Sequence, residues 1–156
     1  MARAPLEPNL VRKVFRKILV PVDFSPHSVA AVDVAAKLAK QLGARLRLVA
    51  VLDVGDLRVA VKAGLHDFKS DADVHRAVRD WIKEQFDRLI VPPDVPHTRG
   101  IRRGIVDQEI LAVIRTWRPE LVVMGSRGLS HRLPIGSKTA EVLRRSSVPV
   151  LIVTGK

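Results

Sequence analysis

The sequence contains no cysteine and no tyrosine, and aromatic residues make up only 4% of its 156 positions. Without cysteine the chain can form neither a disulfide nor a thiolate metal site, and it has no cysteine nucleophile. Its few aromatic residues argue against a stacking platform for single-stranded nucleic acid. No apolar run approaches the roughly 20 residues that cross a membrane, and no signal-peptide pattern is present. We therefore expect a cytoplasmic protein.

Acidic residues are also scarce: the chain has 16 Asp and Glu but 27 Lys and Arg, which gives a net charge of +11. Such a surface attracts phosphate-bearing partners, and salt weakens the attraction. The chain nevertheless shows neither a helix-turn-helix nor a zinc-finger pattern, so nucleic acid is not the expected main partner. A hydrophobic content of 47% in this length favours one folded domain. We predict a domain over residues 15–156 that follows a basic arm at residues 1–14.

The first half of the chain alternates apolar runs with helical periodicity. Residues 17–23 (KILVPVD) predict a central parallel strand that ends at a carboxylate. Ser25 and Pro26 form an N-cap and first-turn pair, and Gly43 ends the helix that follows. Residues 45–52 predict the next strand. Helical spacing predicts that the first helix buries Val29, Val32, Ala35, Ala36 and Ala39.

A second helix is predicted after residues 54–69, whose mixed pattern supports no assignment. Asp71 or Asp73 is the expected N-cap, and the proline-containing run after Leu89 ends the helix. Its predicted core face consists of Val74, Val78, Trp81, Ile82, Phe86 and Leu89.

The second half of the chain continues the alternation. Residues 97–101 predict a short strand and residues 107–117 a helix. A buried strand is expected at residues 121–124, a helix from Ser137, and a last strand over residues 148–153. The order of these elements predicts a doubly wound α/β fold, a five-stranded parallel sheet with strand order 3-2-1-4-5 and helices on both faces.

In a sheet of this kind, ligands bind beyond the carboxyl ends of the strands, where the strand order reverses. The first and fourth predicted strands flank that point. Asp23 ends the first strand, and Gly125 ends the fourth. These two sequence features are therefore expected to meet in one crevice.

Several segments together carry a family resemblance: KILVPVDFSPHS, RLRLVAVLDV, the Gly104–Ile110 segment, LVVMGSRGLS and GSKTAEVLRRSSVPVLIV. With them the chain resembles a universal stress protein domain of the UspA type, from about Phe15 to Thr154. The resemblance implies a five-stranded α/β fold. It also implies a homodimer, because many members of the family pair their last strands, here Val148–Val153.

Nucleotide-binding members of the family carry a Gly-x2-Gly-x9-Gly-Ser/Thr loop, which Gly125, Gly128, Gly136 and Ser137 match in part. The resemblance places Asp23 near a ribose or a metal, backbone atoms of the second strand near adenine, and Ser137 near phosphates. Glycines allow close backbone approach, and a helix N-terminus favours anions. The implied binding residues are Pro21, Asp23, Val51, Met124, Gly125, Arg127, Gly128, Gly136, Ser137 and Lys138.

The loop departs from the family pattern in its length. Seven residues separate Gly128 from Gly136, two fewer than in the motif, and Pro134 removes a backbone donor. The shorter loop predicts a preference for nucleotides with fewer phosphates. Possible cations near the loop are Arg127, His131, Arg132 and Lys138.

The same residues also have purely structural interpretations. Asp23 could cap the turn that follows it, and Gly125 and Gly128 could be turn glycines in a member that binds nothing. Ser137 is the expected helix N-cap in either case. The histidines lack the spacing of a metal cluster, so no metal site is predicted.

The functional hypothesis is a stress-response sensor or regulator that binds ATP or another adenine nucleotide, with or without Mg²⁺. The chain is not expected to be an enzyme beyond slow ATP hydrolysis, because it lacks a complete Walker A motif and a G-x-S-x-G elbow. The alternative, favoured by the shortened loop, is a member that binds no nucleotide and acts through protein–protein interaction. A nucleic-acid-associated role ranks third.

Overall fold

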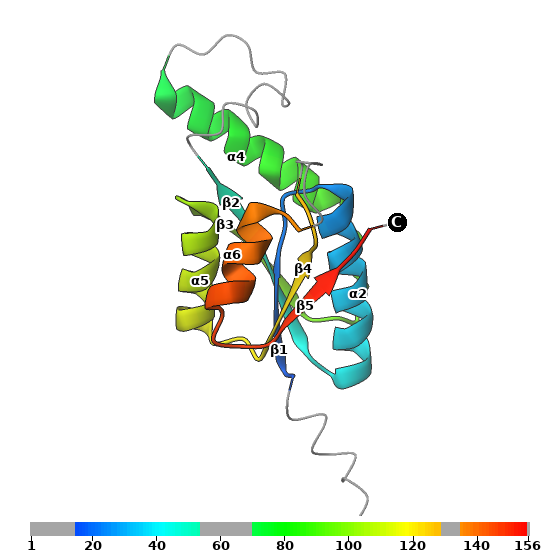
Figure 1. Cartoon of the computed structure of the whole chain (residues 1–156). Coiled ribbons are helices and arrows are strands. Elements are labelled where there is room, and N and C mark those ends of the chain that lie inside the picture. The colour runs from blue at the N-terminus through cyan, green and yellow to red at the C-terminus, as the bar shows by residue number, and fades with distance from the viewer. Residues whose placement is uncertain (1–14, 54–69, 129–134, 156) are drawn as a thin grey trace, which may run out of the picture.

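A computed structural model describes residues 15–53, 70–128 and 135–155 of the chain. Strands and helices alternate through these ranges (Figure 1). None of the helices in them combines the length and the hydropathy that a membrane span requires. The elements are β1 (Lys17–Pro21), α2 (Pro26–Leu42), β2 (Arg45–Leu52), α4 (Asp71–Arg88), β3 (His97–Arg103), α5 (Val106–Trp117), β4 (Leu121–Gly125), α6 (Ser137–Arg145) and β5 (Val150–Val153).

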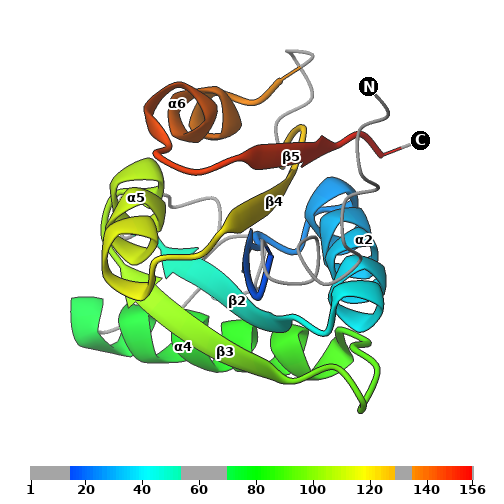
Figure 2. The same ribbon diagram turned by 90° about the horizontal axis from the view of Figure 1, so that it is seen from below.

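All strand pairs are parallel, and the strand order is β3-β2-β1-β4-β5. This confirms the predicted doubly wound fold. Helices α2 and α4 cover one face of the sheet, and α5 and α6 cover the other (Figure 2). The change of face falls between β1 and β4. The chain crosses the sheet in one direction from β1 to β3 and in the other from β3 to β5, and right-handed crossovers in opposite directions must cover opposite faces.

Each face of the sheet has its own apolar core. Because side chains alternate along a strand, Ile18 and Val20 of β1 point toward α2 and α4, whereas Leu19 points toward α5. The central strands are buried on both faces, as their unbroken apolar sequences indicate. This burial fixes the register of the two strands that flank the functional crevice.

The first helix forms as its sequence predicts. The side-chain oxygen of Ser25 accepts a hydrogen bond from the Ser28 N–H, Pro26 is the first helical residue, and Gly43 ends the helix with φ 66°. One core assignment is wrong, because Val29 is 43% exposed and Ala31 takes its place inside.

Two helix caps differ from the prediction. Ser70, not Asp71 or Asp73, caps α4; its hydroxyl oxygen accepts from the Asp73 N–H at 3.3 Å and its O–H donates to the Asp73 carboxylate at 2.8 Å. Gly136 rather than Ser137 is the N-cap of α6. In both cases the helix includes the predicted cap as one of its own residues, so the cap moves one or more positions toward the N-terminus.

Truncation of a central core side chain tests the two-faced burial. Leu48 in β2 is fully buried between β1 and β3, so Leu48→Ala is expected to lower the free energy of unfolding by about 3 kcal/mol through lost burial and a residual cavity. Urea unfolding measures the change. The control is Ile90→Ala, at a side chain that is 89% exposed, and it should change stability by less than about 0.5 kcal/mol. Similar losses for both variants would contradict the assigned core.

Candidate functional site

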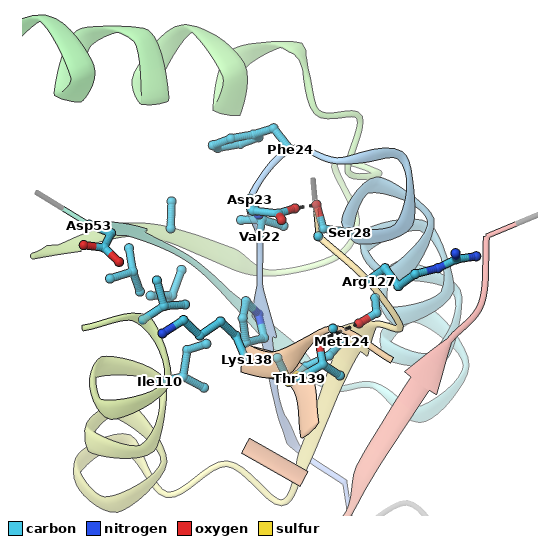
Figure 3. A pocket seen from close by; sticks show the side chains of 18 of the residues that line it. Val22, Asp23, Phe24, Ser28, Asp53, Ile110, Met124, Arg127, Lys138 and Thr139 are labelled. Carbon is cyan, nitrogen blue, oxygen red and sulfur yellow. Dashed lines mark hydrogen bonds between the residues drawn. The ribbon is translucent and has the colours of Figure 1, made fainter. Parts of the chain in front are cut away.

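A cavity of about 480 Å³ opens at the carboxyl ends of β1, β2 and β4, beside the start of α6 (Figure 3). Its volume lies within the range of roughly 300 to 1,000 Å³ that is usual for small-molecule sites. The cavity lies at the switch point between β1 and β4, where the strand order reverses. Its walls are mostly apolar, with a few polar groups at the rim.

Strand β2 presents backbone groups to the cavity because it runs past the end of β1. The ladder between them ends where the Val22 N–H donates to the Val49 carbonyl at 2.9 Å. In a parallel strand, the residues that point their N–H and C=O toward one neighbour alternate. Val51 therefore directs its N–H and C=O toward the β1 side of β2, at a level where β1 has already ended. These two groups form a polar edge that a planar ligand could meet.

Asp23 lies two residues after β1, which ends at Pro21 rather than at Asp23 as predicted, and it is held by the turn that it begins. Its Oδ1 accepts from the Ser25 N–H at 3.0 Å, as the capping interpretation expected. Its Oδ2 lies against Gly128, where a β-carbon would collide with it. The next residue, Phe24, has φ 63°, a left-handed conformation that is unusual for an aromatic residue. One carboxylate oxygen thus fixes the turn while the other faces the glycine loop.

Phe24 also begins an aromatic wall that sequence reasoning missed. Its ring meets Trp81 edge to face at 5.7 Å and Phe86 at 5.2 Å between centroids. Trp81, which was assigned to packing alone, lines the cavity as well as the core. The helical spacing of Trp81 placed it on the correct face of α4 but gave no sign that this face continues into the cavity.

Gly125 allows β4 to end directly against the first turn of α2. A β-carbon at Gly125 would lie 2.7 Å from the carbonyl carbon of His27, a distance that real contacts do not reach. The His27 ring is buried, and its Nδ1 accepts from the Gly155 N–H at 2.9 Å and lies 3.3 Å from the Ser126 hydroxyl. These contacts join the cavity wall, α2 and the segment after β5.

The N-terminus of α6 forms the polar end of the cavity. The Gly136 N–H is already bonded to the Ser126 carbonyl at 2.8 Å, which closes the loop. The first intrahelical bond is donated by Ala140, so the N–H groups of Ser137, Lys138 and Thr139 precede the helical ladder. Such a helix start favours an anion.

Two side-chain contacts hold α6 in this position. The Thr139 hydroxyl donates to the Gly125 carbonyl at 3.1 Å and is buried. The Lys138 ammonium lies 3.3 Å from an oxygen of Asp107 at the start of α5. Figure 3 shows Lys138 reaching across the cavity toward α5.

The structure brings all the predicted binding residues to this cavity. Pro21, Asp23, Val51, Met124, Gly125, Arg127, Gly128, Gly136, Ser137 and Lys138 all line it.

One of these residues differs from the expected role. Figure 3 shows the guanidinium of Arg127 directed away from the cavity, toward β5, so it adds no cation inside. Its Nε is buried without a hydrogen-bond partner in the described part of the chain. His131, Arg132 and Pro134, which were expected to shape the loop, lie outside the described residues. Within the described ranges, no three acidic or histidine side chains are grouped to hold a metal ion.

This fold and the position of its cavity define a doubly wound α/β protein with a ligand-sized site at the switch point. The chain belongs to the universal stress protein family, whose model matches residues 15–154.

Individual proteins of the same family are similar to this chain in sequence and in fold. The chain is 29% identical to the universal stress protein YxiE of Bacillus subtilis (strain 168) over 150 residues, which cover 90% of this chain and 99% of YxiE. A universal stress protein solved in complex with cAMP is 22% identical, with a TM-score of 0.60, and the match covers 91% of this chain and 98% of that one. The universal stress protein from Archaeoglobus fulgidus in complex with dAMP is 16% identical, with a TM-score of 0.58, and coverage of 90% and 98%.

The Thr139 hydrogen bond gives a local test of the site. Thr139→Val keeps the shape of the side chain but leaves the buried Gly125 carbonyl without this donor, so we expect a loss of about 1–2 kcal/mol in unfolding free energy. The matched control is Thr116→Val, at an exposed hydroxyl that donates to Ala112 at 2.9 Å, with an expected change below about 0.5 kcal/mol. Denaturant unfolding measures both. Equal changes would show that the Thr139 contact does not stabilise the site.

Proposed function

We propose that the protein binds an adenine nucleotide in this cavity and acts in the cytoplasm as a ligand-dependent regulator of a stress response. The observation that carries the proposal is the pairing of an apolar slot beside Val51 with amide donors at the start of α6. A planar base fits between apolar side chains, and a phosphate fits a helix start. The cAMP and dAMP complexes of two relatives support the same ligand class.

The slot for the base would be formed by β2 and the side chains opposite it. The Val51 N–H and C=O form a donor–acceptor pair at the slot edge, complementary to the polar edge of adenine. Ile110 and Met124 contribute apolar surface from α5 and β4. The Oδ2 of Asp23 faces the rim, where a ribose hydroxyl can donate to it.

The charges around the cavity favour a ligand that carries few phosphate groups. Among the described residues, Lys138 is the cation that reaches into the cavity, and it is already paired with Asp107. Asp23 and Asp53 also line the cavity and repel additional negative charge. We infer a preference for a nucleoside monophosphate over a triphosphate, in agreement with the shortened loop in the sequence.

We also propose that the protein does not turn over its ligand rapidly. Asp23 uses one oxygen to hold its turn, and Arg127 points away from the phosphate end. Within the described residues, the cation that reaches into the cavity, Lys138, is paired with Asp107, so no unpaired cation is directed at the phosphates as fast phosphoryl transfer requires. Mg²⁺ would arrive with the phosphates of the ligand, because the described side chains do not form a separate metal cluster.

Calorimetry with AMP, ADP and ATP tests the ligand. We expect heat of binding with AMP, and an affinity for AMP at least equal to that for ATP. Gly128→Val should abolish binding, because its side chain would displace the Asp23 carboxylate. Gly100→Val in β3 is the matched control, since a β-carbon there meets only the Leu48 carbonyl oxygen at 4.0 Å. No heat with any of the nucleotides up to about 1 mM would overturn the proposal.

We further propose a homodimer that forms through β5. This strand pairs with β4 on one side only and is one of the two outer strands of the sheet. An outer strand with open backbone groups invites another strand. Leu151 is 38% exposed on it and supplies an apolar contact, whereas the opposite outer strand, β3, carries three arginines.

Light scattering tests the dimer. The unmodified chain should have the mass of two copies, and Leu151→Lys should shift the mass toward one copy, because a charge on the outer strand opposes pairing. Thr98→Lys introduces the same charge on the exposed side of β3 and should leave the dimer intact. A monomeric mass for the unmodified chain would contradict the assignment of β5 as the interface.

A further inference from the structure

Six basic side chains gather at the amino-terminal end of the sheet. Lys17 and Arg45 are paired in register at the starts of β1 and β2, and the Arg45 N–H donates to the Arg16 carbonyl at 2.9 Å. Arg47 lies two residues further along β2, on the same face of the sheet as Lys17. The end of α5 adds two more arginines. We call this set the basic pole: Arg16, Lys17, Arg45, Arg47, Arg115 and Arg118.

The basic pole lies far from the cavity. The cavity is at the carboxyl ends of the strands, and the basic pole is at their amino ends. Figure 1 shows the start of β1 at the lower end of the sheet. From Lys17 to Asp23 the chain rises by about 3.3 Å per residue, or roughly 20 Å in total. The two surfaces are therefore separate, and the proposed nucleotide does not account for the basic pole.

Trp117 holds two of these cations together. The Arg47 guanidinium lies 4.9 Å from the centroid of its ring, and the Lys17 ammonium lies 5.7 Å from it and donates to the Trp117 carbonyl at 3.1 Å. Attraction to the ring offsets part of the repulsion between the two positive groups. The cations cover the ring, so the ring offers little surface for stacking a base.

Within the described ranges, no member of the basic pole has a carboxylate at ion-pair distance. The nearby Glu120 carboxylate instead accepts from the backbone N–H groups of Arg16 and Lys17. Some cations on other faces are paired, for example Lys37 with Asp33 at 2.6 Å. A cluster of unpaired positive groups raises the local positive potential and attracts an anionic partner.

The side chains of the basic pole favour a partner with repeating phosphate groups. Ile90 and Leu143 are exposed at the ends of α4 and α6, at the same end of the sheet, but no exposed large apolar side chain among the described residues belongs to the basic pole. Its groups are mostly arginines, which bind phosphates through paired N–H donors. We propose that the basic pole binds the phosphodiester backbone of double-stranded nucleic acid without reading its sequence.

A charge-matched pair of variants tests this proposal by fluorescence anisotropy with a mixed-sequence DNA duplex of about 20 base pairs at about 50 mM salt. The first variant, Arg45→Gln/Arg115→Gln/Arg118→Asn, removes three exposed cations of the basic pole; asparagine suits the left-handed φ of 52° at position 118. We expect binding about tenfold weaker, with a salt-dependence slope smaller by about 2 to 3.

The control, Lys37→Gln/Lys83→Gln/Arg144→Gln, removes the same charge from exposed positions that are ion-paired. At Arg144, the hydrogen bond to Glu141 at 2.7 Å lowers the pKa of that carboxyl below its ordinary value. We expect this control to bind within about twofold of the unmodified chain. Equal weakening by both variants would overturn the proposal, because it would show attraction by net charge alone.

Further measurements identify the partner and exclude misfolding. Lysine at the three substituted arginine positions should restore binding, and circular dichroism should show the same unfolding temperature for both triple variants. Polyglutamate and vesicles of anionic phospholipid serve as competing probes. Tighter binding of either one than of the duplex, or no duplex binding by the unmodified chain at about 50 mM salt, would overturn the proposal.

Discussion

The site depends on one close approach, the contact between the end of β4 and the first turn of α2. Gly125 leaves no room for a β-carbon against His27, so the two elements meet backbone to backbone. The Gly125 carbonyl then accepts from Thr139, which fixes the start of α6 relative to β4. A wider separation here would move the amide donors of α6 away from the β2 edge. The distance between the β2 edge and the α6 amides, the two ends of the proposed site, is therefore set by the packing of the protein and not by a bound ligand.

The two ends of the sheet offer different kinds of groups to an anion. At the carboxyl end, the groups offered are backbone N–H donors with fixed directions, which suit one small ligand in one orientation. At the amino end, the groups are long side chains around Trp117, which suit a repeating array of charges. Because all the strands are parallel, the carboxyl ends of the strands lie at one edge of the sheet and their amino ends at the other, so the two surfaces are at opposite ends of the molecule.

Much of the fold and the position of the site could be predicted from the sequence, because local signals determine them. Apolar runs and the Ser25–Gly43 helix signals determine the elements, and the crossover rule then brings Asp23 and Gly125 together. The direction of Arg127 was not predictable, since it depends on packing against distant elements. The clustering of unpaired cations around Trp117 was hidden for the same reason: net charge is a property of composition, whereas pairing depends on tertiary contacts.

The contact between Gly128 and Asp23 restricts both positions at once. The space that a side chain at position 128 would need is filled by the Asp23 carboxylate. With aspartate at position 23, a side chain at position 128 requires the carboxylate to move, whereas a shorter residue at position 23 leaves that space open. The effects of substitutions at the two positions are therefore expected to be non-additive, although 104 residues lie between them in the chain.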